Sequence, residues 1–167
     1  MLRCLELLEL CDVSCIAIPC NTAHCWFDEL QSESAVPILH IVDAVHNVLA
    51  DRNALASPVG LLATTATVCA GVYAKRLAHR DVRCIAPNER EQMRVMKVIR
   101  AVKAGAYDGS GEAQLHSVIA SLRDRGAGAI ILGCTELPLA LSANDHGFVD
   151  STAALALECL RQRRKIT

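Results

Sequence analysis

Three features are scarce in this sequence: aromatic residues, an excess of charge of either sign, and long apolar runs. Its 167 residues include only two Phe, two Tyr and one Trp, which excludes an aromatic platform that stacks nucleic-acid bases. The net charge is -1, whereas binding to nucleic acid or an anionic membrane requires a clustered basic field. No charge-free apolar run reaches the ~18 residues of a membrane span. The sequence therefore predicts no nucleic-acid partner and no membrane partner.

The order of apolar segments indicates an α/β fold. Short apolar segments, followed by segments with helical spacing of apolar residues, occur at residues 14–19, 37–41, 59–63, 82–86 and 127–132. Strands that alternate with helices of 10–15 residues are typical of parallel βαβ units. We expect Asp43 to cap a helix over 44–52, Thr64 to begin a helix that runs to residue 78, and Asn88 to cap a helix over 89–103.

Cysteine is unusually frequent, with nine residues. An odd number of cysteines, several of them inside apolar patterns, favours a reducing compartment, the cytoplasm, over a disulfide scaffold. A zinc site at Cys11, Cys15, Cys20 and Cys25 is not supported, because their spacing contains no CxxC pair. We therefore predict no metal.

Two turns in the chain share one layout. Residues 15–22 (CIAIPCNT) and 129–136 (AIILGCTE) each contain an apolar strand, a small or rigid residue, a Cys, and then a Thr near a helix start. Ligands of open parallel sheets lie beyond the carboxyl ends of the strands, and a thiol at a helix N-terminus ionises readily. Cys20 and Cys134 are thus either an acid/base pair or, as for a lone Cys in such a turn, small buried apolar residues.

The motifs of the chain resemble the aspartate/glutamate racemases. They are 19–24 (PCNTAH), 60–64 (GLLAT) with Thr67 and Tyr73, Glu91-Gln92 with 102–105 (VKAG), and 132–137 (LGCTEL). The resemblance implies two similar parallel-sheet lobes related by a pseudo-twofold axis, with one catalytic Cys from each. It also implies inversion at the α-carbon of an acidic amino acid without a cofactor.

The resemblance further implies a role for each site residue. Cys20 and Cys134 would be the catalytic thiols, and Lys103 would face the side-chain carboxylate of the substrate. Glu136 follows the pattern of aspartate-specific members, and His24 either orients a thiolate or only caps its turn. The α-carboxylate of the substrate would be held by Asn21, Thr22, Thr64 and Thr135.

Members of this family begin some tens of residues earlier, so the resemblance implies that the first lobe is truncated. The expected division is a first lobe of residues 1–42, completed by 148–167, and a second lobe of 43–147. We expect an exposed sheet edge, exposed apolar surface and association into a homodimer. Two alternatives stay open at this point: a catalytically inactive remnant of the family, and a related enzyme such as a hydantoin racemase or maleate isomerase.

Overall fold

The computed structural model describes the backbone of residues 1–141 and 147–166 and, within these ranges, the side chains up to residue 163. The strands are β1 (Ile16–Ala17), β2 (Ile38–Leu39), β3 (Val59–Ala63), β4 (Cys84–Ile85), β5 (Ala129–Gly133) and β6 (Phe148–Asp150). The α-helices are α1 (Leu2–Glu9), α2 (Phe27–Ser32), α3 (Ile41–Asp51), α4 (Thr65–Ala70), α5 (Val72–Ala78), α6 (Glu89–Lys103), α7 (Glu112–Asp124), α8 (Leu137–Ala140) and α9 (Ser151–Ile166). A 3-10 helix, η1, spans Thr22–Trp26.

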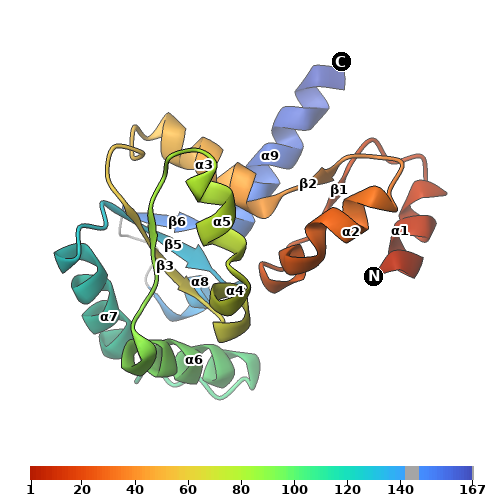
Figure 1. Ribbon diagram of the computed structural model, residues 1–167. Coiled ribbons are helices and arrows are strands. Elements are labelled where there is room, and N and C mark those ends of the chain that lie inside the picture. The colour runs from red at the N-terminus through yellow and green to blue at the C-terminus, as the bar shows by residue number, and fades with distance from the viewer. Residues whose placement is uncertain (142–146, 167) are drawn as a thin grey trace.

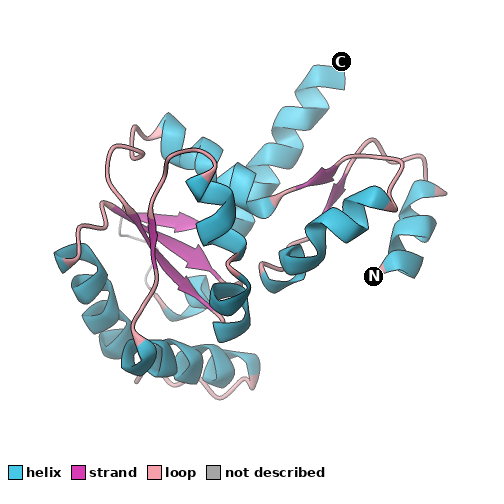
Figure 2. Ribbon diagram, in the orientation of Figure 1, coloured by secondary structure: helices cyan, strands magenta, loops and turns pink. Residues whose placement is uncertain are grey.

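The described strands form two parallel sheets, which confirms the α/β class. One sheet has four strands in the order β4-β3-β5-β6, and the other pairs β1 with β2. Figure 1 shows the helices α6 and α7 on one side of the four-stranded sheet and α3 and α5 on the other. The strands β1 and β2 lie in a separate part of the molecule, near the N-terminus. In Figure 2 the arrows of β3 and β5 point the same way, so their carboxyl ends meet at one edge of the sheet.

Helices cover both faces of the four-stranded sheet. Alternate residues of its central strands point to opposite faces, so all of them are buried. Val59, Leu61 and Ile131 pack with α3, α5 and the start of α9. Leu62 and Ile130 pack with α6, α7 and α8 on the other face. The central strands are therefore apolar throughout, in agreement with the run of Ala, Val, Ile and Leu in the sequence.

Two local predictions were wrong in detail. The helix that follows β2 begins at Ile41, and its N-cap is His40 rather than Asp43: the Nδ1 atom of His40 accepts a hydrogen bond from the Val42 N–H. The single helix expected up to residue 78 is two helices, α4 and α5, because Gly71 between them has a φ of 70°. Such a left-handed residue ends a helix.

Other helix boundaries agree with the sequence. Thr64 caps α4, since its hydroxyl accepts a hydrogen bond from the Thr67 N–H at 3.2 Å. Asn88 and Glu91 form a capping box at the start of α6. These boundaries depend on side chains within three residues of each other, so the sequence alone could predict them.

The part of the molecule that contains β1 and β2 has its own apolar cluster, in which Leu5 of α1 packs with residues of β1, β2 and α2. Exposed large apolar side chains occur on and just after α1: Leu2, Leu7, Leu8 and Leu10. The last strand, β6, pairs with β5 in the four-stranded sheet, while α9 contacts both α3 and β2. The division into lobes at residues 42/43 and 147/148 stays a prediction.

Candidate active site

The carboxyl edge of the four-stranded sheet brings two predicted site residues close together. β3 and β5 are neighbours, and Ala63 is in register with Gly133. Thr64 and Cys134 therefore follow at the same edge from adjacent strands. Gly133 suits this close packing, because a β-carbon there would lie 2.8 Å from Leu61 Cδ1.

The turn after β1 docks against this edge through three threonine hydroxyls. Thr22 Oγ1 lies 3.0 Å from Thr64 Oγ1 and 2.8 Å from Thr67 Oγ1, and the last two atoms are 2.9 Å apart. Each hydroxyl can donate one hydrogen bond and accept two, so three mutually bonded hydroxyls keep acceptor capacity for further donors and can reorient toward an anion. This triangle places the segment that carries Cys20 beside the end of β3.

A buried chain of hydrogen bonds also links the two cysteine turns. The Tyr73 hydroxyl donates to Asn21 Oδ1 at 2.5 Å, and Asn21 Nδ2 donates to Ser151 Oγ at 3.0 Å. Ser151 Oγ in turn donates to the Leu132 carbonyl at 2.8 Å. Asn21 follows Cys20 and Leu132 lies two residues before Cys134, so this chain fixes one turn relative to the other. Buried polar groups of this kind specify one arrangement because an unmade bond is costly.

The environments of the two thiols differ. Cys20 is exposed, whereas Cys134 is 6% exposed and its thiol donates a hydrogen bond to Glu136 Oε2 at 2.8 Å. Burial, and next the Glu136 carboxylate, raise the pKa of Cys134 to about 12. The expectation of a readily ionised thiol is therefore wrong for Cys134. The physical reason is that the helix after it, α8, is short and begins only at Leu137, while a carboxylate lies against the sulfur.

Glu136 connects three predicted site residues. Besides the Cys134 thiol, its Oε2 atom accepts a hydrogen bond from Thr135 Oγ1 at 3.1 Å, and its Oε1 atom lies 3.7 Å from Lys103 Nζ. Burial disfavours the charged carboxylate, but these hydrogen bonds and the Lys103 charge hold the pKa of Glu136 below its ordinary value. The side chain of Lys103 is 55% exposed, so it is free to turn toward another carboxylate.

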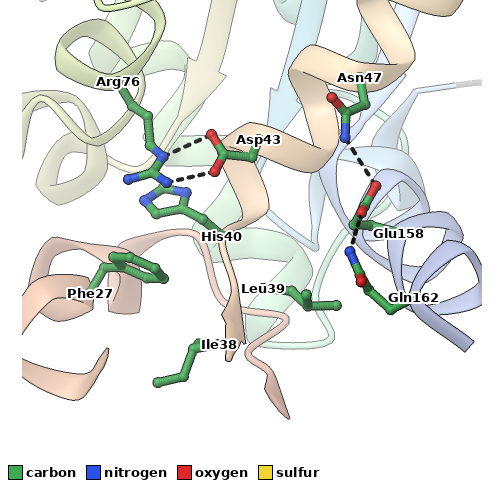
Figure 3. A pocket seen from close by; sticks show the side chains of 9 residues that line it. All are labelled: Phe27, Ile38, Leu39, His40, Asp43, Asn47, Arg76, Glu158 and Gln162. Carbon is green, nitrogen blue, oxygen red and sulfur yellow. Dashed lines mark hydrogen bonds and ion pairs between the residues drawn. The ribbon is translucent and has the colours of Figure 1, made fainter. Parts of the chain in front are cut away.

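Aromatic and charged side chains pack together beside the segment that follows Cys20, and Figure 3 shows Phe27, His40 and the Asp43–Arg76 pair of this group. The His24 and His40 rings lie 4.7 Å apart between their centroids, and the Phe27 ring lies 4.4 Å from the His40 ring. Arg76 donates two hydrogen bonds to Asp43, at 2.8 and 2.6 Å. His24 Nε2 donates to the Ile18 carbonyl at 3.1 Å, which anchors the segment just before Cys20.

The structure thus places Thr22 against Thr64, Asn21 against Ser151 at the start of α9, and Glu136 among Cys134, Thr135 and Lys103. Sequence reasoning missed Ser151 as a member of the site. It lies 130 residues from Asn21, and a Ser near a helix start is explained by capping alone. Thr67 and Tyr73 were visible only as parts of a motif.

No group of three or more His, Cys, Asp or Glu side chains that could hold a metal ion occurs in the part of the chain that the structure describes. All nine cysteines are free thiols. None of the helices within residues 1–141 and 147–166 combines the length and the apolar character that crossing a membrane would require.

Comparisons with known proteins show which family the chain belongs to. The chain is 30% identical over 151 residues to the broad specificity amino-acid racemase RacX of Bacillus subtilis, covering 89% of this chain and 64% of RacX. An aspartate racemase homologue from Pyrococcus horikoshii superposes with a TM-score of 0.83 at 28% identity, covering 96% of this chain and 71% of that one. Picrophilus torridus aspartate racemase gives 0.76 at 30% identity, covering 95% and 65%. The model of the Asp/Glu/hydantoin racemase family matches residues 1–159, and the chain therefore belongs to that family.

Proposed function

We propose that the protein is a cofactor-independent racemase of an acidic amino acid, with aspartate as the preferred substrate, and that Cys20 and Cys134 carry out the proton transfers. The observation that carries this proposal is the hydrogen-bonded chain from Asn21 through Ser151 to the Leu132 carbonyl. It links the two similar strand-Cys turns, each of which carries one thiol. Family membership supports the reaction class.

In this proposal the two thiols act on opposite faces of the α-carbon. The Cys20 thiolate takes the α-proton, so that the C–H bond breaks, an S–H bond forms and the electron pair passes to the α-carboxylate. The Cys134 S–H bond then breaks and its proton forms a new C–H bond on the other face. Cys134 suits the donor role because its thiol is held protonated beside Glu136. The reverse sequence returns both thiols to their starting states.

The substrate carboxylates have matching partners in this arrangement. The hydroxyls of Thr22 and Thr64 can donate to the α-carboxylate by leaving the threonine triangle, with Thr135 and Asn21 as further donors. Lys103, partly exposed and 3.7 Å from Glu136, would pair with the side-chain carboxylate. His24 would hold the Cys20 segment through Ile18.

Racemisation in deuterated water tests the proposal. The wild-type protein should invert L-aspartate and incorporate deuterium at the α-carbon. Cys20→Ser and Cys134→Ser should each abolish inversion, because an alcohol is far too weakly acidic to replace a thiol in proton transfer. Either variant is still able to exchange the α-proton from one face. Cys4→Ser, on the exposed side of α1, is the matched control and should remain active.

Retained inversion in Cys20→Ser would disprove the two-thiol mechanism. Wild-type protein that neither inverts nor deuterates aspartate, glutamate or any amino acid of a broader panel would disprove racemase activity in this chain. The panel is warranted because RacX, by its name, has broad specificity. Lys103→Met should raise KM for aspartate more than for alanine, since alanine has no side-chain carboxylate.

We also propose a cytoplasmic location and assembly into a homodimer. Nine free thiols suit the reducing cytoplasm. The exposed leucines of α1 suit contact with a second copy of the chain in a homodimer. Sedimentation at several protein concentrations would detect such a dimer.

A further inference from the structure

A cavity of about 280 Å³ lies between residues 24–28, which follow the Cys20 turn, and helix α5. The His24 and His40 side chains form part of its wall. Its polar lining is rich in nitrogen. Asp28 supplies the one carboxylate among the residues that line the cavity. Five of the lining side chains carry basic or imidazole nitrogens: His24, His40, Lys75, Arg76 and His79. Phe27 adds an aromatic wall.

His40 supplies a donor without a partner. The side chain is 7% exposed, and its Nδ1 atom accepts a hydrogen bond from the Val42 N–H. The ring is neutral, since burial, and next His24 and Arg76, lower its pKa to about 3. A neutral imidazole that accepts at Nδ1 carries its proton at Nε2. That N–H makes no hydrogen bond with the residues that the structure describes.

Two cations complete the lining. Lys75 makes no hydrogen bond or ion pair through its ammonium group with the described part of the chain, and its stem lies against Gly71, where a β-carbon would come within 3.0 Å of Lys75 Cε. Arg76 is held in place by Asp43 and by the Phe27 ring, 5.1 Å from its guanidinium carbon. Asp43 also accepts a hydrogen bond from Arg80 at 2.9 Å, so the carboxylate is shared and Arg76 retains net attraction for an anion.

We propose that this cavity binds a small dianion, a phosphate or a dicarboxylate, at a site separate from the two thiols. The His40 N–H and the Lys75 ammonium would donate to its oxygens, with Arg76 adding charge. Charged hydrogen bonds of this kind are stronger than neutral ones. Anion binding in this cavity does not require racemase activity. It concerns the segment that holds Cys20, because His24 both lines the cavity and bonds to Ile18.

Calorimetric titration with inorganic phosphate and, separately, succinate tests this site and tells the two chemistries apart. The wild-type protein should bind at least one of them at millimolar concentration or below. Lys75→Met should weaken that binding about tenfold. His40→Asn should do likewise, because Asn keeps the cap on Val42 but lacks the Nε2 donor. Lys97→Met removes the same charge from an exposed position on α6 and should leave binding unchanged.

The alternative location for an anion is the threonine triangle, so Thr64→Ser and Thr64→Val are included. Binding that persists in Thr64→Val and weakens in Lys75→Met supports the proposal. Binding lost in Thr64→Val but unchanged in Lys75→Met and His40→Asn would overturn it, as would failure of both probes to bind the wild-type protein at 10 mM, on the order of the weakest affinity that such a site would give.

Discussion

Removal of the Glu136 charge should make the Cys134 thiol more reactive. In the structure, Cys134 Sγ lies 2.8 Å from Glu136 Oε2, and the carboxylate opposes formation of a thiolate at that distance. Coulomb's law gives about 1.5 kcal/mol for two unit charges so placed in a water-like medium. Burial is the larger cause of the raised pKa of Cys134, and the Glu136 carboxylate is the second.

A change of about 1.4 kcal/mol corresponds to a tenfold change in thiolate population. Glu136→Gln should therefore accelerate alkylation of Cys134 by iodoacetamide about tenfold at pH 8, measured for each cysteine by peptide mass spectrometry. Lys103→Met should slow it, since the Lys103 charge lowers the pKa of Cys134. Cys20 serves as the internal reference, and Glu33→Gln, exposed and distant in sequence, is the matched control.

The two variants must change the rate in opposite directions. Equal rates in wild type and Glu136→Gln would show that the carboxylate does not control the proton on Cys134. A slower rate in Glu136→Gln would show that the hydrogen bond orients the sulfur for reaction instead, which would remove the reason for assigning Cys134 the donor role.

Three further predictions concern the contacts around the site. Tyr73→Phe leaves Asn21 Oδ1 buried without its donor, so the free energy of unfolding in urea should fall by about 1–3 kcal/mol; no change would show that water replaces the hydroxyl. Thr64→Val removes the cap of α4 and should cost about 1 kcal/mol, while Thr64→Ser should cost much less; equal losses would argue against the cap. The pKa of His40 is about 3 in the folded protein and 6.5 as its ordinary value. Between these pH values only the unfolded chain takes up the proton. The free energy of unfolding should therefore fall as the pH falls, by at most about 1.4 kcal/mol per pH unit. His40→Asn should flatten that part of the pH profile, and an identical profile in both proteins would contradict the assignment.

Much of the local structure could be predicted from the sequence because it depends on neighbouring residues. The strands that precede Cys20 and Cys134, the Thr64 cap and the capping box of Asn88 all involve residues close together in the chain. The similar layout of the two cysteine turns was also visible without a structure. Such features follow from backbone geometry and short-range hydrogen bonds, which any fold containing the segment must satisfy.

Other features depended on contacts between distant residues. Asp is a preferred N-cap residue, so the sequence favoured Asp43. In the structure His40 caps the helix instead, and its ring packs against His24 and Phe27. The break at Gly71 was missed because an isolated Gly is tolerated within a helix. Its positive φ is a property of how α4 and α5 each pack on the rest of the protein.

Tertiary structure decided how deeply the groups of the site are buried. The sequence identified Cys134 and Glu136, but their pKa directions follow from burial and from the orientation of one carboxylate toward the sulfur. The link from Asn21 to Ser151 joins residues 130 positions apart, and no local pattern encodes that distance. The sequence by itself therefore determined which groups the two turns carry. Tertiary folding decided which of these groups meet and raised the pKa of Cys134 by burying it, because desolvation and charge act through space rather than along the chain.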